Sequence, residues 1–312
     1  MTAITSFKEL TAHLSQLRRR LRLAVVQGTD SSTRYAVRRA ADAGFVEPIF
    51  VGGREELDMC PEIRNIAHLV TYVETNTARE SAEEGVRLVR EGRADILMKG
   101  LIKTDELLHA VLHKECGILP RGRVLTHIAC ARLPQYGKML FLTDAAVIPF
   151  PTQQQRIAQV HYVAELCRKF GIARPRIALT HCTEKVDAKT FPFTVELRDL
   201  VEQGRRGDFG PCIIDGPLDV KTACHLESME MKGIHSPIHG EADALVFPDI
   251  EAGNTFYKTI TLFGGAETAG MLQGTTAPVV LTSRADSPLT KYYSLALAAI
   301  ACNAAQTEAT LD

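Results

Sequence analysis

The sequence lacks several features that would place a protein in a specialised class. Its eight cysteines form no CxxC pair, a pattern typical of reduced thiols in a cytosolic protein. The most apolar late stretch, residues 294–302, is about half the length needed to span a bilayer. The first ten residues include Lys8 and Glu9 and have no apolar core of a signal peptide. We therefore expect a cytoplasmic protein that does not associate with membranes.

Neither sign of charge is in excess, because the chain contains 36 Lys and Arg residues and 37 Asp and Glu residues. Such a balance gives no general attraction for nucleic acid or anionic lipid, so we expect neither as a partner. The chain also contains no P-loop, no GxGxxG fingerprint and no GxSxG elbow. Nucleotide hydrolysis and ordinary NAD binding therefore lose support.

What is present is an alternation of short apolar runs and longer segments of helical periodicity, in a chain of 312 residues. Continuous apolar runs between helices predict parallel strands covered on both faces, hence an α/β fold with mostly parallel sheets. The number of units predicts two domains, with a boundary at the proline-interrupted loop 148–151. The predicted strands lie near residues 23–26, 48–51, 94–98, 124–129, 139–142, 177–179, 212–214, 244–247 and 279–281. The predicted helices include residues 31–43, 77–91, 153–170, 190–203, 219–231, 252–263 and 288–303.

Polar residues follow most of the predicted strands. Ligands of open parallel sheets bind beyond the carboxyl ends of the strands, so these turns are candidate site segments. Lys99 and Arg284 are the most informative, since a cation at a buried strand end usually faces an anion. Ser283 precedes Arg284, and Ser287 with Pro288 predicts the N-cap and first residue of the last helix. An oxyanion bound there would meet a hydroxyl, a cation and helix N–H groups.

Other side chains carry weaker signals. The glycine-rich stretch 263–270 would let the backbone approach a ligand closely. His109, His113 and Cys116 lack a fourth metal ligand. Pro237 separates His235 from His239, so these two with Glu241 do not share a helix face, and we expect no metal site. Cys182 beside His181 is only weak evidence for a thiol nucleophile.

Several segments, in order, resemble the phosphate acetyltransferase/phosphate butyryltransferase family, especially its short, butyryltransferase-like branch. Together they cover about residues 90 to 300. They are residues 94–101, 142–147, 215–218, 242–254, 257–266 and 277–284.

The resemblance implies a first α/β domain of residues 1–148 plus about 283–312, and a second domain of residues 149–282. It implies a homodimer and an acyl-CoA cleft between the domains. The implied reaction is reversible transfer of a short-chain acyl group between coenzyme A and inorganic phosphate. Coenzyme A would be a substrate rather than a bound cofactor, and no metal or covalent acyl-enzyme would be needed.

The resemblance also implies roles for particular residues. Ser283 would lie by the thiol and the reacting carbonyl, and Arg284 would stabilise phosphate charge. Lys99 and Gly100 would line the phosphate side, with Thr104 capping the following helix. The remaining substrate-binding or phosphate-binding candidates are Asp144, Asn254, Lys258, Gly264 and Gly265.

The chain departs from the family pattern in two places. Acetyltransferase members carry an acidic residue about seven positions after the serine, a candidate base for the thiol proton. This chain has Thr290 at that position. Asp286 is the nearest acidic residue, and substrate phosphate is an alternative acceptor of the proton. Lys103 and His109 stand where relatives more often have an acid and an arginine. The alternatives are a CoA- or phosphate-binding regulator without activity, which Thr290 favours, and a dehydrogenase of related fold.

Overall fold

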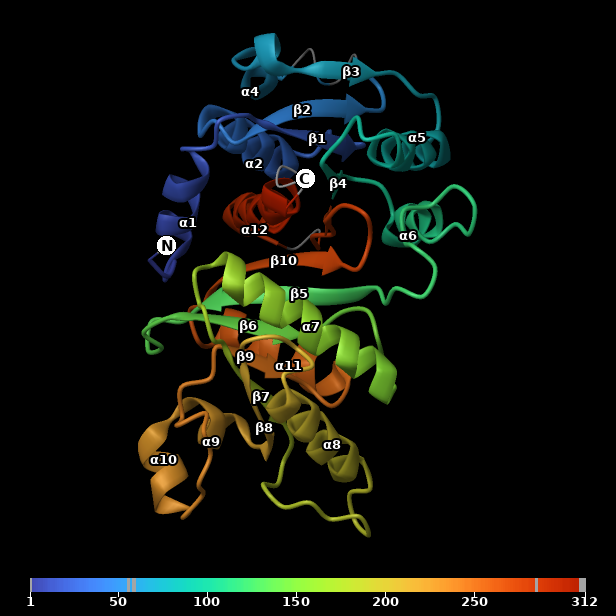
Figure 1. Ribbon diagram of the computed structural model, residues 1–312. Coiled ribbons are helices and arrows are strands. Elements are labelled where there is room, and N and C mark those ends of the chain that lie inside the picture. Colours follow the sequence, from blue (N-terminus) through green and yellow to red (C-terminus); the bar gives the residue numbers. More distant parts are fainter. Residues whose placement is uncertain (1, 55–56, 58–59, 284–285, 309–312) are drawn as a thin grey trace. The chain divides into compact units, whose positions relative to one another are not determined.

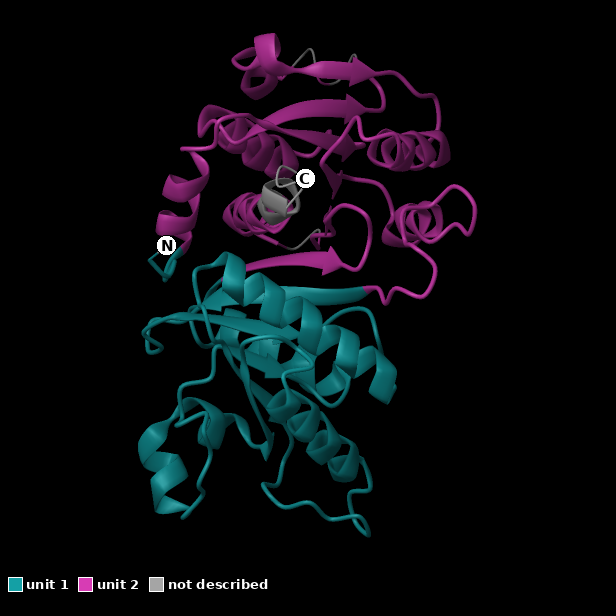
Figure 2. Cartoon of the chain, viewed as in Figure 1, with its two compact units in different colours: residues 1–6, 126–267 teal, residues 7–125, 268–312 magenta. Residues whose placement is uncertain are grey.

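The computed structural model describes residues 2–54, 57, 60–283 and 286–308, and it contains two compact units (Figure 2). Unit 1 comprises residues 1–6 and 126–267, and unit 2 comprises residues 7–125 and 268–312. The expected boundaries at residues 148 and 282 fall inside these units. Strand pairing explains the difference, because β5 (Thr126–Arg132) pairs with β6 (Met139–Thr143) inside unit 1. In unit 2, β11 (Val279–Val280) pairs with β4 (Ile96–Lys99).

The strands of unit 2 follow the order β3-β2-β1-β4-β11-β10. Their neighbours are parallel except for β10, which runs antiparallel to β11. The carboxyl ends of β1, β4 and β11 therefore meet at one edge, as the parallel-sheet prediction requires. The remaining strands of this unit are β1 (Leu21–Val26), β2 (Val46–Val51), β3 (Thr71–Val73) and β10 (Glu267–Gln273).

The helices of unit 2 start at polar caps that the sequence supplies. The Asp30 side chain accepts the backbone N–H of Thr33 at the start of α2, and Thr77 with Glu80 forms the predicted capping box of α5. Helix α12 packs against α2, and both lie in the same part of unit 2 (Figure 1). These helices are α1 (Phe7–Leu14), α2 (Ser31–Asp42), α4 (Pro61–Arg64), the 3₁₀ turn η1 (Ala67–Leu69), α5 (Ala78–Arg90), α6 (Thr104–Val111) and α12 (Pro288–Glu308).

The strands of unit 1 follow the order β5-β6-β9-β7-β8, and only the β5–β6 pair is antiparallel. Leu142, Ala178 and Leu245, from three neighbouring strands, are fully buried in one apolar cluster, which stabilises the sheet by removing apolar surface from water. The remaining elements of this unit are α7 (Gln153–Lys169), β7 (Arg176–Thr180), α8 (Phe193–Arg206), β8 (Ile213–Leu218), α9 (Val220–Cys224), α10 (Leu226–Met231), β9 (Ala244–Val246) and α11 (Ile250–Leu262).

The structure confirms the predicted α/β class and most of the predicted elements. It differs at residues 219–231, where one predicted helix is two short helices that meet at His225. The backbone of His225 is extended, and its side chain accepts the N–H of Ser228, so it ends one helix and starts the next. In the part of the chain that the structure describes, no helix is both long and apolar enough to cross a membrane.

Candidate functional site at the carboxyl edge of unit 2

Two predicted site residues lie at the carboxyl edge of the unit 2 sheet. Lys99 is the last residue of β4, and Ser283 follows the neighbouring parallel strand β11, which pairs with β4 at Met98 and Val280. Lys99 is only 3% exposed, and its Nζ donates to the carbonyl of Gly100 at 3.2 Å, whereas Ser283 is exposed. The edge thus combines a buried cation with an accessible hydroxyl.

Gly100 has a packing reason to be glycine. A Cβ atom there would lie 2.2 Å from the carbonyl oxygen of Gln27 and 2.7 Å from the Cα of Gly28. The end of β4 therefore approaches the end of β1 more closely than any side chain would allow. Its predicted part in lining the phosphate side stays a prediction, because packing alone accounts for the missing side chain.

Asp286 stabilises the turn that contains Ser283 through two hydrogen bonds. Its Oδ2 accepts the backbone N–H of Ser283 at 2.7 Å, and its own N–H donates to the carbonyl of Ser283 at 3.2 Å. One carboxylate oxygen is thus committed to holding the serine in place. Arg284, the predicted phosphate-binding cation, lies outside the described residues.

The start of α12 confirms the predicted cap and shows how Thr290 is used. Ser287 Oγ accepts the backbone N–H of Thr290 at 3.0 Å, and Pro288 is the first helical residue. The Thr290 hydroxyl lies 3.0 Å from the same Ser287 oxygen. The residue in place of the family's acid therefore takes part in capping.

A buried ion pair at the same edge was not found from the sequence. Lys291 Nζ lies 3.0 Å from Asp30 Oδ1 and 3.1 Å from Thr33 Oγ1. Burial by itself raises the pKa of Asp30, but hydrogen bonds from Thr33 and Lys291 outweigh it and lower the pKa from 3.8 to about 2. Asp30 lies in a strand-end turn of the predicted kind. No local pattern marks Lys291, which is 261 residues away from Asp30 in the sequence.

The expected cap at Thr104 is wrong by one residue. Lys103 occupies the N-cap position of α6 and makes no side-chain cap hydrogen bond, whereas Thr104 is already the first helical residue. Asp105 and Glu106 in the first turn compensate, since acidic side chains interact favourably with a helix N-terminus. Any substrate contact of Thr104 stays a prediction.

Two further candidates, Asp144 and Asn254, meet in unit 1 and hold a turn. The buried Asp144 carboxylate accepts the Thr126 hydroxyl at 2.8 Å, the backbone N–H of His127 and those of residues 146–148. Asn254 donates to the carbonyl of Ala145 at 2.8 Å. With five donors on its two oxygens, the Asp144 carboxylate is committed to this turn.

The remaining predicted candidates cluster near the end of α11. Lys258 is exposed, with its Nζ 5.9 Å from the ring centroid of Tyr257. Gly265 has a φ of +62°, which favours glycine, and a Cβ at Gly264 would lie 2.8 Å from the carbonyl oxygen of Ile260. The glycine-rich segment therefore ends one helix before β10 starts. A ligand-binding role for these three residues stays a prediction.

Unit 1 also contains a largely apolar pocket of about 960 Å³ near the end of β7. Cys182 Sγ lies 3.6 Å from Nδ1 of His181 at its wall. The Arg156 guanidinium lies over the Phe193 ring, 4.0 Å from the ring centroid, and pairs with Glu196 at 3.0 Å. Burial lowers the pKa of Arg156 from 12.5 to about 10 despite the attraction of Glu196. In the sequence, only the weak Cys182–His181 signal points to this pocket.

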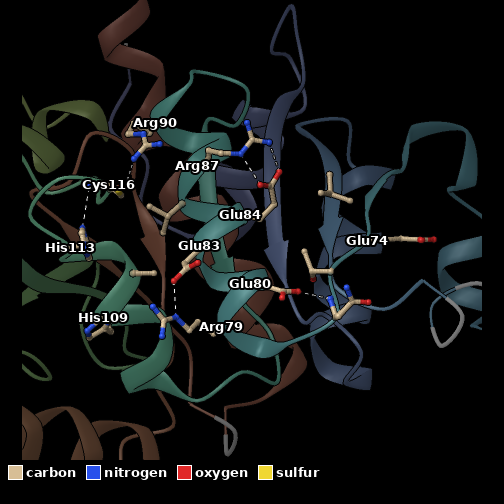
Figure 3. Close-up of a pocket in the computed structure, with 15 residues that line it drawn as sticks. Glu74, Arg79, Glu80, Glu83, Glu84, Arg87, Arg90, His109, His113 and Cys116 are labelled. Carbon is tan, nitrogen blue, oxygen red and sulfur yellow. Dashed lines mark hydrogen bonds and ion pairs between the residues drawn. The ribbon is translucent and has the colours of Figure 1, made fainter.

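A second pocket, of about 760 Å³, lies within unit 2 between α5 and α6, and its walls hold the three candidate metal ligands His109, His113 and Cys116 (Figure 3). His113 Nδ1 accepts the backbone N–H of Cys116 at 3.2 Å, which engages one ring nitrogen. Ion pairs such as Arg79–Glu83, at 2.8 Å, balance the charges on its walls. Among the described residues, no group of three or more potential ligands is placed to hold a metal.

The comparisons with known proteins agree on one family. The family model described as "Phosphate acetyl/butaryl transferase" matches residues 71–299. The chain is 35% identical over 298 residues to a phosphate butyryltransferase of Clostridium acetobutylicum, covering 95% of this chain and 98% of the relative. It is 33% identical over 284 residues to a phosphate acetyltransferase of Thermotoga maritima, covering 89% and 94%.

A solved structure shows the same similarity in three dimensions. The crystal structure of a branched-chain phosphotransacylase from Enterococcus faecalis matches with a TM-score of 0.80 and 33% sequence identity. The match covers 90% of this chain and 99% of that one. The similarity therefore extends over both compact units.

Proposed function

The chain belongs to the phosphate acetyl/butyryl transferase family, and we propose that it transfers a short-chain acyl group reversibly between coenzyme A and inorganic phosphate. The family membership confirms the resemblance read from the sequence segments and makes the protein a phosphate acyltransferase-type enzyme. Coenzyme A, acyl phosphate and phosphate are then its substrates. A homodimer and an acyl-CoA cleft between the domains stay predictions.

One observation carries the assignment of the reaction to the unit 2 edge. Lys99 ends β4, and Ser283 lies three residues after the end of the neighbouring parallel strand β11, so a buried cation and an exposed serine belong to the same edge. A transferring phosphate needs positive charge, and a carbonyl that gains negative charge needs a hydrogen-bond donor. In our proposal Lys99 supplies the first and Ser283 the second.

The proposed mechanism is direct attack of the coenzyme A thiolate on the carbonyl of the acyl phosphate. The carbon–sulfur bond forms as the carbon–oxygen bond to phosphate breaks, and phosphate leaves with the bonding electrons. Ser283 orients the thiol and the carbonyl, and Arg284 stabilises the charge on the leaving phosphate. No acyl group is attached to the protein at any stage.

The thiol proton needs an acceptor, because a free thiol has a pKa of about 8.5. The hydrogen bond between Asp286 Oδ2 and the N–H of Ser283 supports a positioning role for Asp286. We therefore assign proton removal to a phosphate oxygen of the substrate. In the reverse direction, the same oxygen returns the proton to the departing thiolate.

The test is release of coenzyme A thiol from acetyl- through hexanoyl-CoA, followed with a thiol reagent in the presence and absence of inorganic phosphate. We expect release only when phosphate is present, with a preferred chain length that measures the acyl site. If the protein binds acyl-CoA but releases no thiol with any member of the panel, the proposed function is wrong.

A further inference from the structure

Thr282 is an exception among the buried hydroxyl groups of the described residues. The residue is 7% exposed, and its Oγ1 is buried with no hydrogen-bond partner. No other serine or threonine of the described chain has a fully buried hydroxyl oxygen without a partner. Thr180, the last residue of the parallel strand β7, donates to the carbonyl of Val246 at 3.0 Å. Burial at a strand end thus does not by itself leave a threonine unpaired.

The position of Thr282 links it to the proposed site. The β4–β11 register pairs Met98 with Val280. Thr282 follows Val280 by two residues, just as Gly100 follows Met98. Ser283 is the next residue along the chain. The unpaired hydroxyl therefore belongs to the same edge as Lys99 and Ser283.

An unpaired buried hydroxyl destabilises the folded protein, because the group has lost its hydrogen bonds to water and gained none. Valine has nearly the same shape and would avoid this loss. A threonine at this position therefore needs a partner that the protein itself does not supply. Next to a site for an oxyanion, that partner is an acceptor on the substrate.

We propose that the Thr282 hydroxyl binds substrate phosphate by donating a hydrogen bond to one of its oxygens, an inference that rests on the proposed function. Phosphate oxygens are strong acceptors, and hydrogen bonds to charged groups are among the stronger ones. One rotation of about 120° about the Cα–Cβ bond moves the hydroxyl to another staggered position. Because Thr282 Oγ1 is buried in the structure, we expect this rotation to accompany phosphate binding.

The test compares Thr282→Val, which removes the hydroxyl at constant shape, with Thr282→Ser, which keeps it. Thr180→Val is the matched control, because it removes a hydroxyl that already has a partner. Two quantities are measured for each: the melting temperature with and without inorganic phosphate, and the KM for phosphate and for acyl-CoA in the thiol-release assay.

For Thr282→Val we expect a KM for phosphate raised about tenfold or more, with the KM for acyl-CoA unchanged. Without phosphate, its melting temperature should stay the same or rise by about 2 °C, since an unpaired hydroxyl is gone. Thr282→Ser should keep the phosphate affinity. Thr180→Val should melt at a lower temperature and keep the wild-type KM for phosphate.

In the activity assay and the melting experiments, the inference is overturned by an unchanged KM for phosphate in Thr282→Val, or by a fall of its melting temperature like that of Thr180→Val. The proposed function can fail separately. If the wild type releases no thiol, but phosphate raises its melting temperature and Thr282→Val abolishes that shift, the phosphate-binding role stands. If the shift survives in full in that variant, the inference is wrong as well.

Discussion

The ammonium group of Lys291 lies 3.0 Å from the carboxylate of Asp30, which joins the first turn of α12 to the turn that follows β1. The Lys291 side chain is only 5% exposed, so removing one partner leaves the other without compensation in a site with little water. Both residues belong to the edge that carries Lys99 and Ser283. The ion pair thus holds two segments of the proposed site in place.

Lys291→Met should therefore lower the free energy of unfolding by about 3 kcal/mol. Arg79→Met is the control, since it breaks an exposed ion pair with Glu83 and should change stability by less than about 0.5 kcal/mol. Urea unfolding of the two variants measures both effects. Equal losses would show that burial does not set the strength of the Asp30–Lys291 pair.

The same pair predicts a pH dependence. The pKa of Asp30 is lowered from 3.8 to about 2, so its contribution is complete above pH 3.8 and is lost as the pH falls toward 2. After allowance for solvent screening, the ionised Asp30 carboxylate contributes about 1 kcal/mol to the free energy of unfolding. Lys291→Met should lose less stability between pH 5 and pH 2 than the wild type does. An identical pH slope in both proteins would contradict the assignment.

Asp144→Asn tests whether the carboxylate holds the turn at residues 144–148. An amide nitrogen cannot accept the hydrogen bonds that one carboxylate oxygen accepts now, so we expect a loss of about 3 kcal/mol in unfolding free energy. Asp249→Asn is the control, because Asp249 caps α11 through one hydrogen bond that asparagine also makes. A loss as small as that of the control would mean that the turn does not depend on the charge.

Asp286 is predicted to position Ser283 and not to take the thiol proton. Asp286→Asn keeps an oxygen that accepts the N–H of Ser283, so kcat should stay within about threefold of the wild type. Asp286→Ala should lose about tenfold in kcat, and neither variant should change the shape of the pH–rate profile. If Asp286→Asn removes a limb of the profile, the carboxylate is a base and the assignment is wrong.

Arg284→Ala tests the role that the family resemblance implies for this residue. An arginine that stabilises phosphate charge should, when removed, raise the KM for phosphate by at least about tenfold and leave the dissociation constant of coenzyme A nearly unchanged. Steady-state kinetics and calorimetric titration with coenzyme A separate the two. Comparable losses of phosphate use and coenzyme A binding would contradict the role.

The fold was largely predictable because its signals are local. Apolar runs such as residues 23–26 and caps such as Thr77 with Glu80 determine structure within a few residues. Strand β10 was missed because it begins directly after the turn containing Gly264 and Gly265 and includes Gly270, so glycines obscure its apolar pattern. The break at His225 was missed because either side of it has helical periodicity.

The site was predictable only in part, for a related reason. Strand ends such as Lys99 and Ser283 can be recognised, since each follows an apolar run. The partner of Asp30 could not be, because Lys291 is distant in sequence and looks like any lysine on a helix. Asp144 also looked like a ligand-binding residue, and only its five hydrogen-bond donors show that the carboxylate holds a turn.

The most direct test of the account is phosphate-dependent thiol release by the wild type and by Ser283→Ala, measured side by side with the preferred acyl-CoA. Removing a preorganised donor at a reacting carbonyl typically costs about 100-fold or more in kcat. We expect that loss in Ser283→Ala at an unchanged melting temperature. Wild-type turnover in Ser283→Ala would contradict the placement of the reaction at the unit 2 edge.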